Sequence, residues 1–325
     1  MKIVFFGTKP YDKLWFEPLA KEYGIDVDFV ETKCAEKSVV LAKGADAICV
    51  FVNDKITAGM IDKLHEMGVK GILLRCAGFN NVDVKAAKDK MVILRVPSYS
   101  PEAVAEYAMA MLLTVNRKTH RAYTRTRDFN MSIQGLMGTN LHGKCAGVIG
   151  TGKIGQAMIR MLKGFSMDIL AYDPYPNENL DVTYVTLEEL IKKSDIITLH
   201  CPLTEETKHL INRETISLMK DNVYLINTSR GALIESNSLI EGLLNKKFAG
   251  AGLDVYEEEA GVFFEDRSDD IITDEILARL TTFPNVLITS HMGFFTSEAM
   301  EAIARCTIEN ALELEKGGPY TNEVK

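Results

Sequence analysis

The nine residues Gly147 to Gly155, GVIGTGKIG, decide the fold of this 325-residue chain. Apolar residues lead into Gly150, and Gly150, Gly152 and Gly155 follow in the spacing GxGxxG before the helical stretch QAMIRMLKGF. A strand, a glycine turn and a helix in this order turn the N–H groups of the helix N-terminus toward an anion, and the glycines let backbone approach a pyrophosphate. The stretch therefore predicts a dinucleotide-binding βαβ unit.

A carboxylate after the next strand indicates which dinucleotide binds. The strand DILAYD ends in Asp173, about twenty residues beyond the glycines. A carboxylate in that place accepts hydrogen bonds from the adenosine ribose and repels a 2′-phosphate. The plainer alternative is a turn residue before Pro174. The order of strand, turn, helix, strand and acid predicts NAD in preference to NADP.

Short β-branched runs alternate with helical patterns along the rest of the chain, as is typical of βαβ units and parallel sheets. The predicted strands outside the glycine unit cover 2–7, 26–31, 45–52, 70–78, 91–96, 195–202, 222–229, 249–256 and 285–291. A long helical pattern begins near Pro101 and runs toward residue 128, and another begins at Ser297. The sequence predicts an α/β fold of two doubly wound parallel-sheet domains, Rossmann-like and flavodoxin-like, joined by long helices. Residues 1–101 and 298–325 would form one domain and residues 102–297 the other.

Composition narrows the kind of partner. Hydrophobic residues make up 46% and charged residues 25%, as in a soluble globular protein. The net charge of −8 argues against a nucleic acid or an anionic membrane as partner, since either would require clustered Lys and Arg. No apolar run is long enough for a signal peptide or a spanning helix. Six cysteines without CxxC spacing predict reduced thiols, a cytoplasmic location and no metal site. A small molecule is the expected partner.

Three predicted strands are followed by ionisable groups. Arg230 follows one, Asp254 and Glu259 follow the next, and His291 follows the last. The carboxyl ends of parallel strands meet at one edge, so these groups are expected near one ligand. Each also has a plainer interpretation: Arg230 as an exposed cation, Glu259 as part of a solvated acidic run and His291 as a cap.

Several motifs together carry a family resemblance. They are GVIGTGKIG, NTSRG, GLDVYEEE and NVLITSHMG, preceded by RCAGFNNVD and VPSYSPEAVAEYAM. In this order and at these separations they resemble the D-isomer-specific 2-hydroxyacid dehydrogenase family over almost the whole chain. The long connection from Glu259 to His291 is most similar to the branch of D-lactate and D-2-hydroxyisocaproate dehydrogenases.

The resemblance implies NAD-dependent reduction of a 2-oxo acid to the D-2-hydroxy acid, with pyruvate as the leading substrate. Arg230 would hold the substrate carboxylate and polarise the carbonyl through its fixed fork of donors. His291 would be the general acid, because an imidazole exchanges a proton near neutral pH. Glu259 would hydrogen-bond that imidazole and favour its protonated form.

The resemblance also implies contacts for substrate and cofactor. For the substrate they are Phe51, Ala77, Gly78 and Tyr99, and for NAD they are Gly150, Thr151, Gly152, Lys153, Ile154, Gly155, Asp173, His200, Cys201, Pro202, Thr228 and Asp254. Phe51 stands where lactate enzymes often carry tyrosine, which leaves 2-oxoisocaproate, phenylpyruvate or a dicarboxylate open as substrates. Core packing is the alternative role for Phe51.

Two further expectations follow from the family. Its enzymes are commonly homodimers that pack through their cofactor domains, so a homodimer is expected. The family also includes NAD-sensing corepressors, which carry extensions for partner recognition. Here the predicted acid, base and arginine are all present, which favours an enzyme.

Overall fold

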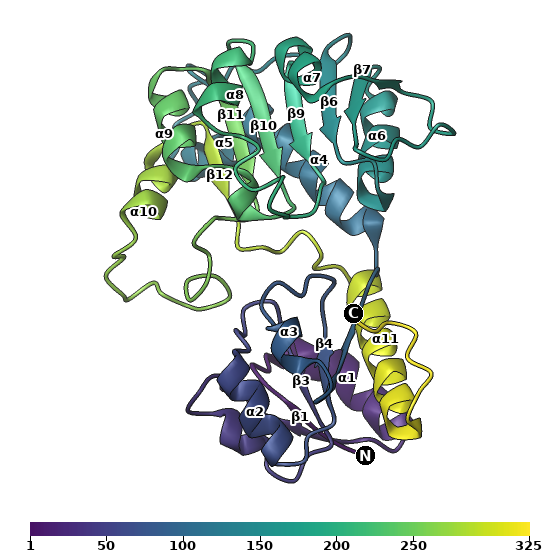
Figure 1. Cartoon of the computed structure of the whole chain (residues 1–325). Helices are drawn as coiled ribbons and strands as arrows, with labels where there is room; N and C mark the ends of the chain where they lie inside the picture. Colours follow the sequence, from purple (N-terminus) through teal and green to yellow (C-terminus); the bar gives the residue numbers. More distant parts are fainter. The chain divides into compact units, whose positions relative to one another are not determined.

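The computed structural model describes residues 1–325 and divides the chain into two compact units (Figure 1). Unit 1 comprises Met1–Ser100 and Phe295–Lys325, and unit 2 comprises Pro101–Phe294. Each unit contains one sheet, of five and seven strands respectively, and every strand pair in both sheets is parallel. The predicted fold class is confirmed.

The sheet of unit 1 has the strand order β2-β1-β3-β4-β5. Its strands are β1 (Lys2–Phe5), β2 (Asp26–Phe29), β3 (Ala47–Val50), β4 (Gly71–Leu74) and β5 (Val92–Arg95). β3 and β4 are buried along their whole length, which explains why their sequences are unbroken apolar runs instead of alternating ones. The order is that of flavodoxin-like folds, and it reverses between β1 and β3.

Five helical segments belong to unit 1: α1 (Pro10–Glu22), η1 (Val39–Ala42), α2 (Ala58–Glu66), α3 (Val84–Ala87) and α11 (Ser297–Lys316). α11 packs on α1 and on strands β4 and β5, whereas α2 packs on η1 and α3. α11 approaches β4 closely at Gly71, where a Cβ would lie 2.5 Å from a methyl group of Leu314 and would displace that side chain. The segment synthesised after unit 2 thus completes the core of unit 1.

The sheet of unit 2 has the strand order β12-β11-β10-β9-β6-β7-β8. Its strands are β6 (Cys145–Ile149), β7 (Asp168–Tyr172), β8 (Thr183–Tyr184), β9 (Ile196–Leu199), β10 (Val223–Asn227), β11 (Phe248–Leu253) and β12 (Val286–Ile288). The order reverses between β6 and β9, as in dinucleotide-binding Rossmann folds. The two-residue edge strand β8 was not predicted from the sequence.

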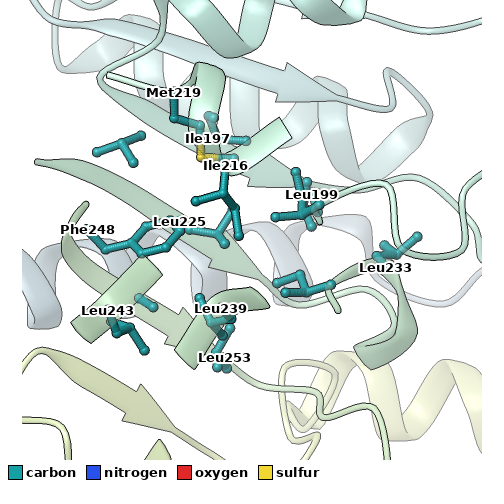
Figure 2. Packing of buried hydrophobic residues seen from close by; sticks show 14 of the residues in the cluster. Ile197, Leu199, Ile216, Met219, Leu225, Leu233, Leu239, Leu243, Phe248 and Leu253 are labelled. Carbon is teal, nitrogen blue, oxygen red and sulfur yellow. The ribbon is translucent and has the colours of Figure 1, made fainter. Parts of the chain in front are cut away.

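Helices cover both faces of this sheet. They are α4 (Pro101–Arg117), α5 (Thr119–Arg127), α6 (Lys153–Gly164), α7 (Leu187–Lys193), α8 (Arg213–Leu218), η2 (Gly231–Leu233), α9 (Ser236–Leu244) and α10 (Glu275–Thr282). Successive strand residues point to opposite faces, so Leu225 joins one hydrophobic cluster while Ile226 joins the other. Figure 2 shows the first cluster, where Ile197, Leu225 and Leu253 of the strands pack with side chains such as Ile216 and Leu239.

One helical prediction was wrong. The pattern from Pro101 to about residue 128 suggested a single long helix, but α4 ends at Arg117 and α5 begins at Thr119. Lys118 between them has the left-handed backbone angles φ 52° and ψ 35°, which a right-handed helix cannot continue through. α5 also buries none of its residues. No helix in the chain combines the length and the apolar character needed to cross a bilayer.

Candidate active site

The three glycines of GVIGTGKIG face different surroundings in the turn between β6 and α6. Gly150 has φ +93°, and a Cβ there would lie 2.6 Å from the backbone nitrogen of Cys201. A Cβ at Gly155 would lie 2.0 Å from the carbonyl oxygen of Gly150, whereas nothing lies within 4 Å of a Cβ at Gly152. Packing therefore requires the first and third glycines, and the second borders open space.

The N-terminus of α6 lies at that open space. Gly152 is its N-cap and no side chain caps it, so the N–H groups of Lys153, Ile154 and Gly155 lack partners within the helix. An uncapped helix N-terminus with approachable backbone binds a pyrophosphate well. At the end of β10, the buried hydroxyl of Thr228 also has no hydrogen-bond partner. The chain's own groups therefore fit a bound dinucleotide.

Asp173 lies beside the glycine turn, directly after β7. Its Oδ2 accepts hydrogen bonds from the Thr151 N–H (2.7 Å) and the Thr151 hydroxyl (3.0 Å). Its Oδ1 accepts from the N–H of Tyr175 at 2.9 Å. The hydroxyl of Tyr184, on the edge strand β8, donates to Thr151 Oγ1 at 3.0 Å. Tyr184 was missed from the sequence because nothing marks so short an edge strand.

His200, Cys201 and Pro202 follow β9, across the strand-order reversal from the glycine turn. The His200 N–H donates to the carbonyl of Ile149 at 2.8 Å, and its Nε2 lies 2.8 Å from the hydroxyl of Thr198. Burial lowers the pKa of His200 to about 4 and raises the pKa of Cys201 to about 11. Both side chains are therefore neutral at pH 7, and Pro202 is exposed. The side chains of this segment therefore bring no charge to the cofactor site.

Arg230 is held in a turn just after β10. The side chain of Asn227 donates to the Arg230 carbonyl at 2.9 Å and accepts from the Ser229 N–H at 3.0 Å, and Arg230 Nη1 donates to the Ser229 carbonyl at 2.7 Å. A Cβ at Gly231 would lie 2.0 Å from the carbonyl of Tyr256. Glycine at 231 therefore lets the turn that carries Arg230 rest directly on the segment after β11.

Glu259 and His291 form a pair. His291 Nδ1 lies 2.9 Å from Glu259 Oε1, and the side chains are 14% and 23% exposed, so both remain open to a ligand. The N–H of Tyr256 donates to the other carboxylate oxygen of Glu259 at 3.1 Å. The ring of Phe264 lies 6.0 Å from the imidazole, centroid to centroid. Since β10, β11 and β12 are neighbours in the sheet, Arg230, Glu259 and His291 follow three adjacent strands.

Asp254 organises the turn that carries His291. Asp254 is 1% exposed, and its carboxylate accepts hydrogen bonds from Thr289 Oγ1 (2.5 Å), the Met292 N–H (2.9 Å) and the Gly293 N–H (2.7 Å). Its carbonyl accepts from the His291 N–H at 2.7 Å. Burial raises the pKa of Asp254, against the lowering effect of these donors and of His291. These bonds hold His291 at φ +55°, a costly conformation for a residue with a side chain.

The substrate residues expected in unit 1 follow β3, β4 and β5. Phe51 is 9% exposed, and the Arg75 guanidinium lies 4.9 Å from its ring centre. Ala77 and Gly78 are half-buried, and neither N–H group donates a hydrogen bond. Asn81 Nδ2 donates to the Phe51 carbonyl at 2.9 Å and so links these segments. Tyr99 is half-buried, one residue before the first segment of unit 1 ends at Ser100.

Outside this site, unit 2 has a second histidine–carboxylate contact, between His209 Nε2 and Glu257 Oε1. All six cysteines are free thiols, and no three side chains of His, Cys, Asp or Glu are arranged to hold a metal ion.

A Rossmann-ordered sheet with an open helix N-terminus, an acid after the second strand and a histidine–carboxylate pair defines a nicotinamide-dependent dehydrogenase. The sequence model of the D-isomer specific 2-hydroxyacid dehydrogenase, NAD binding domain, matches residues 109–293. The chain belongs to this family of D-2-hydroxyacid dehydrogenases, and NAD is its cofactor.

Relatives and solved structures agree with this assignment. The D-lactate dehydrogenase of Escherichia coli (strain K12) is 49% identical, over the full length of both chains. The apo-structure of D-lactate dehydrogenase from Escherichia coli superposes with a TM-score of 0.90 at 47% identity and also covers both chains fully. The NAD complexed form of a D-isomer specific 2-hydroxyacid dehydrogenase from Lactobacillus delbrueckii ssp. bulgaricus gives 0.82 at 29% identity, again over all of both chains. The predicted family and cofactor are confirmed, and the corepressor alternative finds no support among these proteins.

Proposed function

We propose that the protein reduces pyruvate to D-lactate with NADH. Its similarity to D-lactate dehydrogenases along its entire length supports pyruvate as the substrate. The observation that carries the chemistry is the 2.9 Å contact between His291 and Glu259. These residues follow β12 and β11, and Arg230 follows β10, the next strand in the order β12-β11-β10.

The three side chains divide the work of reduction. NADH, when bound, supplies the hydride that C2 of the substrate receives. Arg230 binds the substrate carboxylate and polarises the carbonyl group. Its positive charge stabilises the negative charge that develops on the carbonyl oxygen during hydride transfer. Glu259 accepts a hydrogen bond from the Nδ1–H of His291, which orients the imidazole and leaves Nε2 to donate a proton to that oxygen. In the reverse direction Nε2 takes the proton back from the hydroxyl group.

Cofactor binding falls to unit 2 in this proposal, within the expected domain 102–297. The turn from Gly150 to Gly155 receives the pyrophosphate on backbone N–H groups, and Asp173 accepts from the adenosine ribose. The segment His200 to Pro202 and Thr228 border the cofactor, and Asp254 lies toward the nicotinamide.

Substrate binding falls largely to the other expected domain, 1–101 with 298–325. The free N–H groups of Ala77 and Gly78 receive the carboxylate, Tyr99 provides a hydroxyl, and Phe51 contacts the substrate side chain.

Two measurements test the function. The first compares kcat/KM for pyruvate, 2-oxoisocaproate and phenylpyruvate with NADH; we expect pyruvate to lead. If a larger acid leads, Phe51 borders a roomier pocket and the substrate assignment fails while the reaction class stands. If none of the three is reduced, the proposed function itself fails.

The second measurement concerns His291. His291→Gln should lower kcat by a factor of about 1,000, because the proton donor is lost, and leave the Kd for NADH within twofold. His65→Gln is the matched control, since His65 is exposed and its imidazole contacts only the carbonyl of Lys90. Turnover by His291→Gln at the level of the control would remove His291 from the mechanism.

We further propose a homodimer formed through unit 2, in the cytoplasm. Four large apolar side chains are 68–87% exposed within nine residues of unit 2: Phe129, Met131, Ile133 and Met137. A second copy of the chain would remove them from water. Sedimentation equilibrium should give twice the 36.2 kDa chain mass, and a mass near one chain would refute the dimer.

A further inference from the structure

The turn after β4 has an arrangement in which successive carbonyl groups are fixed and successive N–H groups are free. The Cys76 carbonyl accepts from the Val96 N–H at 3.2 Å, the Ala77 carbonyl accepts from Arg95 Nη1 at 2.8 Å, and the Gly78 carbonyl accepts from the Cys76 thiol at 3.3 Å. The N–H groups of Ala77 and Gly78 donate to nothing in the protein. The carbonyl groups of the turn are thus bound within the protein, and the N–H groups of Ala77 and Gly78 point away from those bonds.

Peptide geometry connects the two sides of the turn. In a planar trans peptide the C=O of one residue and the N–H of the next point in opposite directions. The bond from Arg95 to the Ala77 carbonyl therefore sets the direction of the Gly78 N–H. Because the donor is a guanidinium, the bond is charge-assisted and also polarises the peptide, which makes that N–H a better donor.

Arg95 is itself held from several directions. Its guanidinium lies 5.2 Å from the ring centre of Phe79, the residue that follows the turn. Its backbone N–H donates to the Asn322 carbonyl at 3.1 Å, and its carbonyl accepts from Asn310 Nδ2 at 2.9 Å. Asn322 Nδ2 in turn donates to Asn310 Oδ1 at 2.8 Å. The segment near residue 322 and helix α11 thus fix Arg95 in place.

We propose that Arg95 is a positioning residue that aims and polarises the Gly78 N–H toward the substrate carboxylate. The inference rests on the proposed function, in which that N–H binds the carboxylate. Arg95 acts through the peptide between Ala77 and Gly78, so its contribution is to substrate affinity. The carboxylate is bound alike before and during hydride transfer, so KM should change and kcat should not.

The test compares three variants of the full-length enzyme. Arg95→Met keeps the aliphatic stem and removes the donor, Arg95→Lys keeps a cation that can donate to the same carbonyl, and Arg305→Met is the control. Arg305 is an exposed arginine of α11 in the same unit, paired only with Glu301. We expect Arg95→Met to raise the KM for pyruvate roughly tenfold, with kcat within threefold and the Kd for NADH unchanged. The KM of Arg95→Lys for pyruvate should lie between those of Arg95→Met and the wild type.

Two results would overturn the proposal. One is a KM for Arg95→Met within twofold of the control. The other is an equal loss in Arg95→Lys and Arg95→Met, which would assign the effect to general disturbance of the turn. Active sites are counted by NADH titration, so that a misfolded fraction does not lower the kcat, and the KM does not depend on the amount of active enzyme. If the wild type reduces no 2-oxo acid, the proposed function fails first and separately.

Discussion

In unit 1 the strand order reverses between β1 and β3, and in unit 2 it reverses between β6 and β9. Such reversals are where open α/β sheets bind ligands. After β1 a buried Arg75 donates to the carbonyls of Phe6 and Gly7, at 3.2 and 3.3 Å, and its Nε lies 3.8 Å from a carboxylate oxygen of Asp12. Asp12 also accepts from the Lys9 N–H at the start of α1. After β6 the corresponding helix, α6, has no side-chain cap.

The two reversals of strand order therefore differ in the groups that lie beside them. In unit 1 the chain's own ion pair of Arg75 and Asp12 lies beside the turn after β1, and Phe51 packs on that arginine. In unit 2 the crevice is lined by glycine and backbone N–H groups and keeps space for an external anion. The topology supplies a potential site in both units, and the side chains at the first turn decide whether a ligand can use it.

The largest expected effect comes from placing a charged side chain beside the reversal in unit 2, as Arg75 and Asp12 are placed in unit 1. Gly152→Asp places a carboxylate at the N-cap of α6, where no neighbour hinders a side chain. The new cap should keep or raise the melting temperature, whereas repulsion of the pyrophosphate should weaken NADH binding about 100-fold. Calorimetry and NADH fluorescence titration measure the two changes. Gly152→Asn, an uncharged cap of the same shape, should lose less affinity; equal affinities would show that charge at this position is irrelevant.

The converse change removes the cation of the ion pair in unit 1. Arg75→Met leaves Asp12 buried without its cation and should lower the free energy of unfolding by about 3–5 kcal/mol at pH 7. Burial already raises the pKa of Asp12 while Arg75 lowers it, so the variant raises that pKa further. Stability tied to a raised carboxyl pKa is lost as pH rises through it, so the loss should be smaller at pH 4.5 than at pH 7. Urea unfolding at both pH values measures this.

A loss for Arg75→Met that is the same at both pH values would contradict the role given to Asp12. The Kd for NADH of the folded variant should equal that of the wild type, because the cofactor site belongs to the other unit. A large change in that Kd would mean that the two reversals are not independent.

A smaller effect is expected at the acid beside the open turn. Asp173→Asn keeps the shape and weakens acceptance from the ribose hydroxyls, so the preference for NADH over NADPH in kcat/KM should fall roughly tenfold. Steady-state kinetics with both cofactors measures the ratio. Parity of the two cofactors in the wild type would already exclude Asp173 from this role.

The smallest effect concerns the support of that turn. Tyr184→Phe removes the hydroxyl that donates to Thr151 and accepts from the Asn177 N–H, both at 3.0 Å. The Kd for NADH should rise about threefold, since one partly exposed hydrogen bond is worth about 1 kcal/mol or less. Tyr123→Phe is the control, because Tyr123 is 63% exposed in the same unit. Equal Kd values for NADH in the two variants would show that the glycine turn keeps its conformation without the Tyr184 hydroxyl.

Local patterns in the sequence were enough to predict the strands and the glycine unit. Buried parallel strands such as β3 and β4 are continuous apolar runs, and GVIGTGKIG has its chemistry within nine residues. The break at Lys118 and the strand β8 were not predictable in this way. A lysine in the left-handed region carries no signature, and two residues at a sheet edge show no periodicity.

Long-range pairing limited what could be predicted at the site. The positions of Arg230, Glu259 and His291 after strands suggested one edge, but the contacts of Asp254 with Thr289 and Gly293 join residues more than thirty positions apart. The pairing of Asp12 with Arg75 likewise depends on the fold, because no local pattern relates two side chains on different elements. Residue types could be chosen from the sequence, whereas their partners required the tertiary structure.

The packing of α11 on β4 and β5 bears on how the chain folds as it is made. Unit 2 is one continuous segment, but the helix that covers the sheet of unit 1 is synthesised after all of unit 2. The first hundred residues therefore leave the ribosome with the apolar faces of β4 and β5 exposed. Domains generally fold as units during synthesis, so unit 2 can close its core while unit 1 still waits for α11. Chaperones that bind exposed apolar strands have that interval in which to act on unit 1.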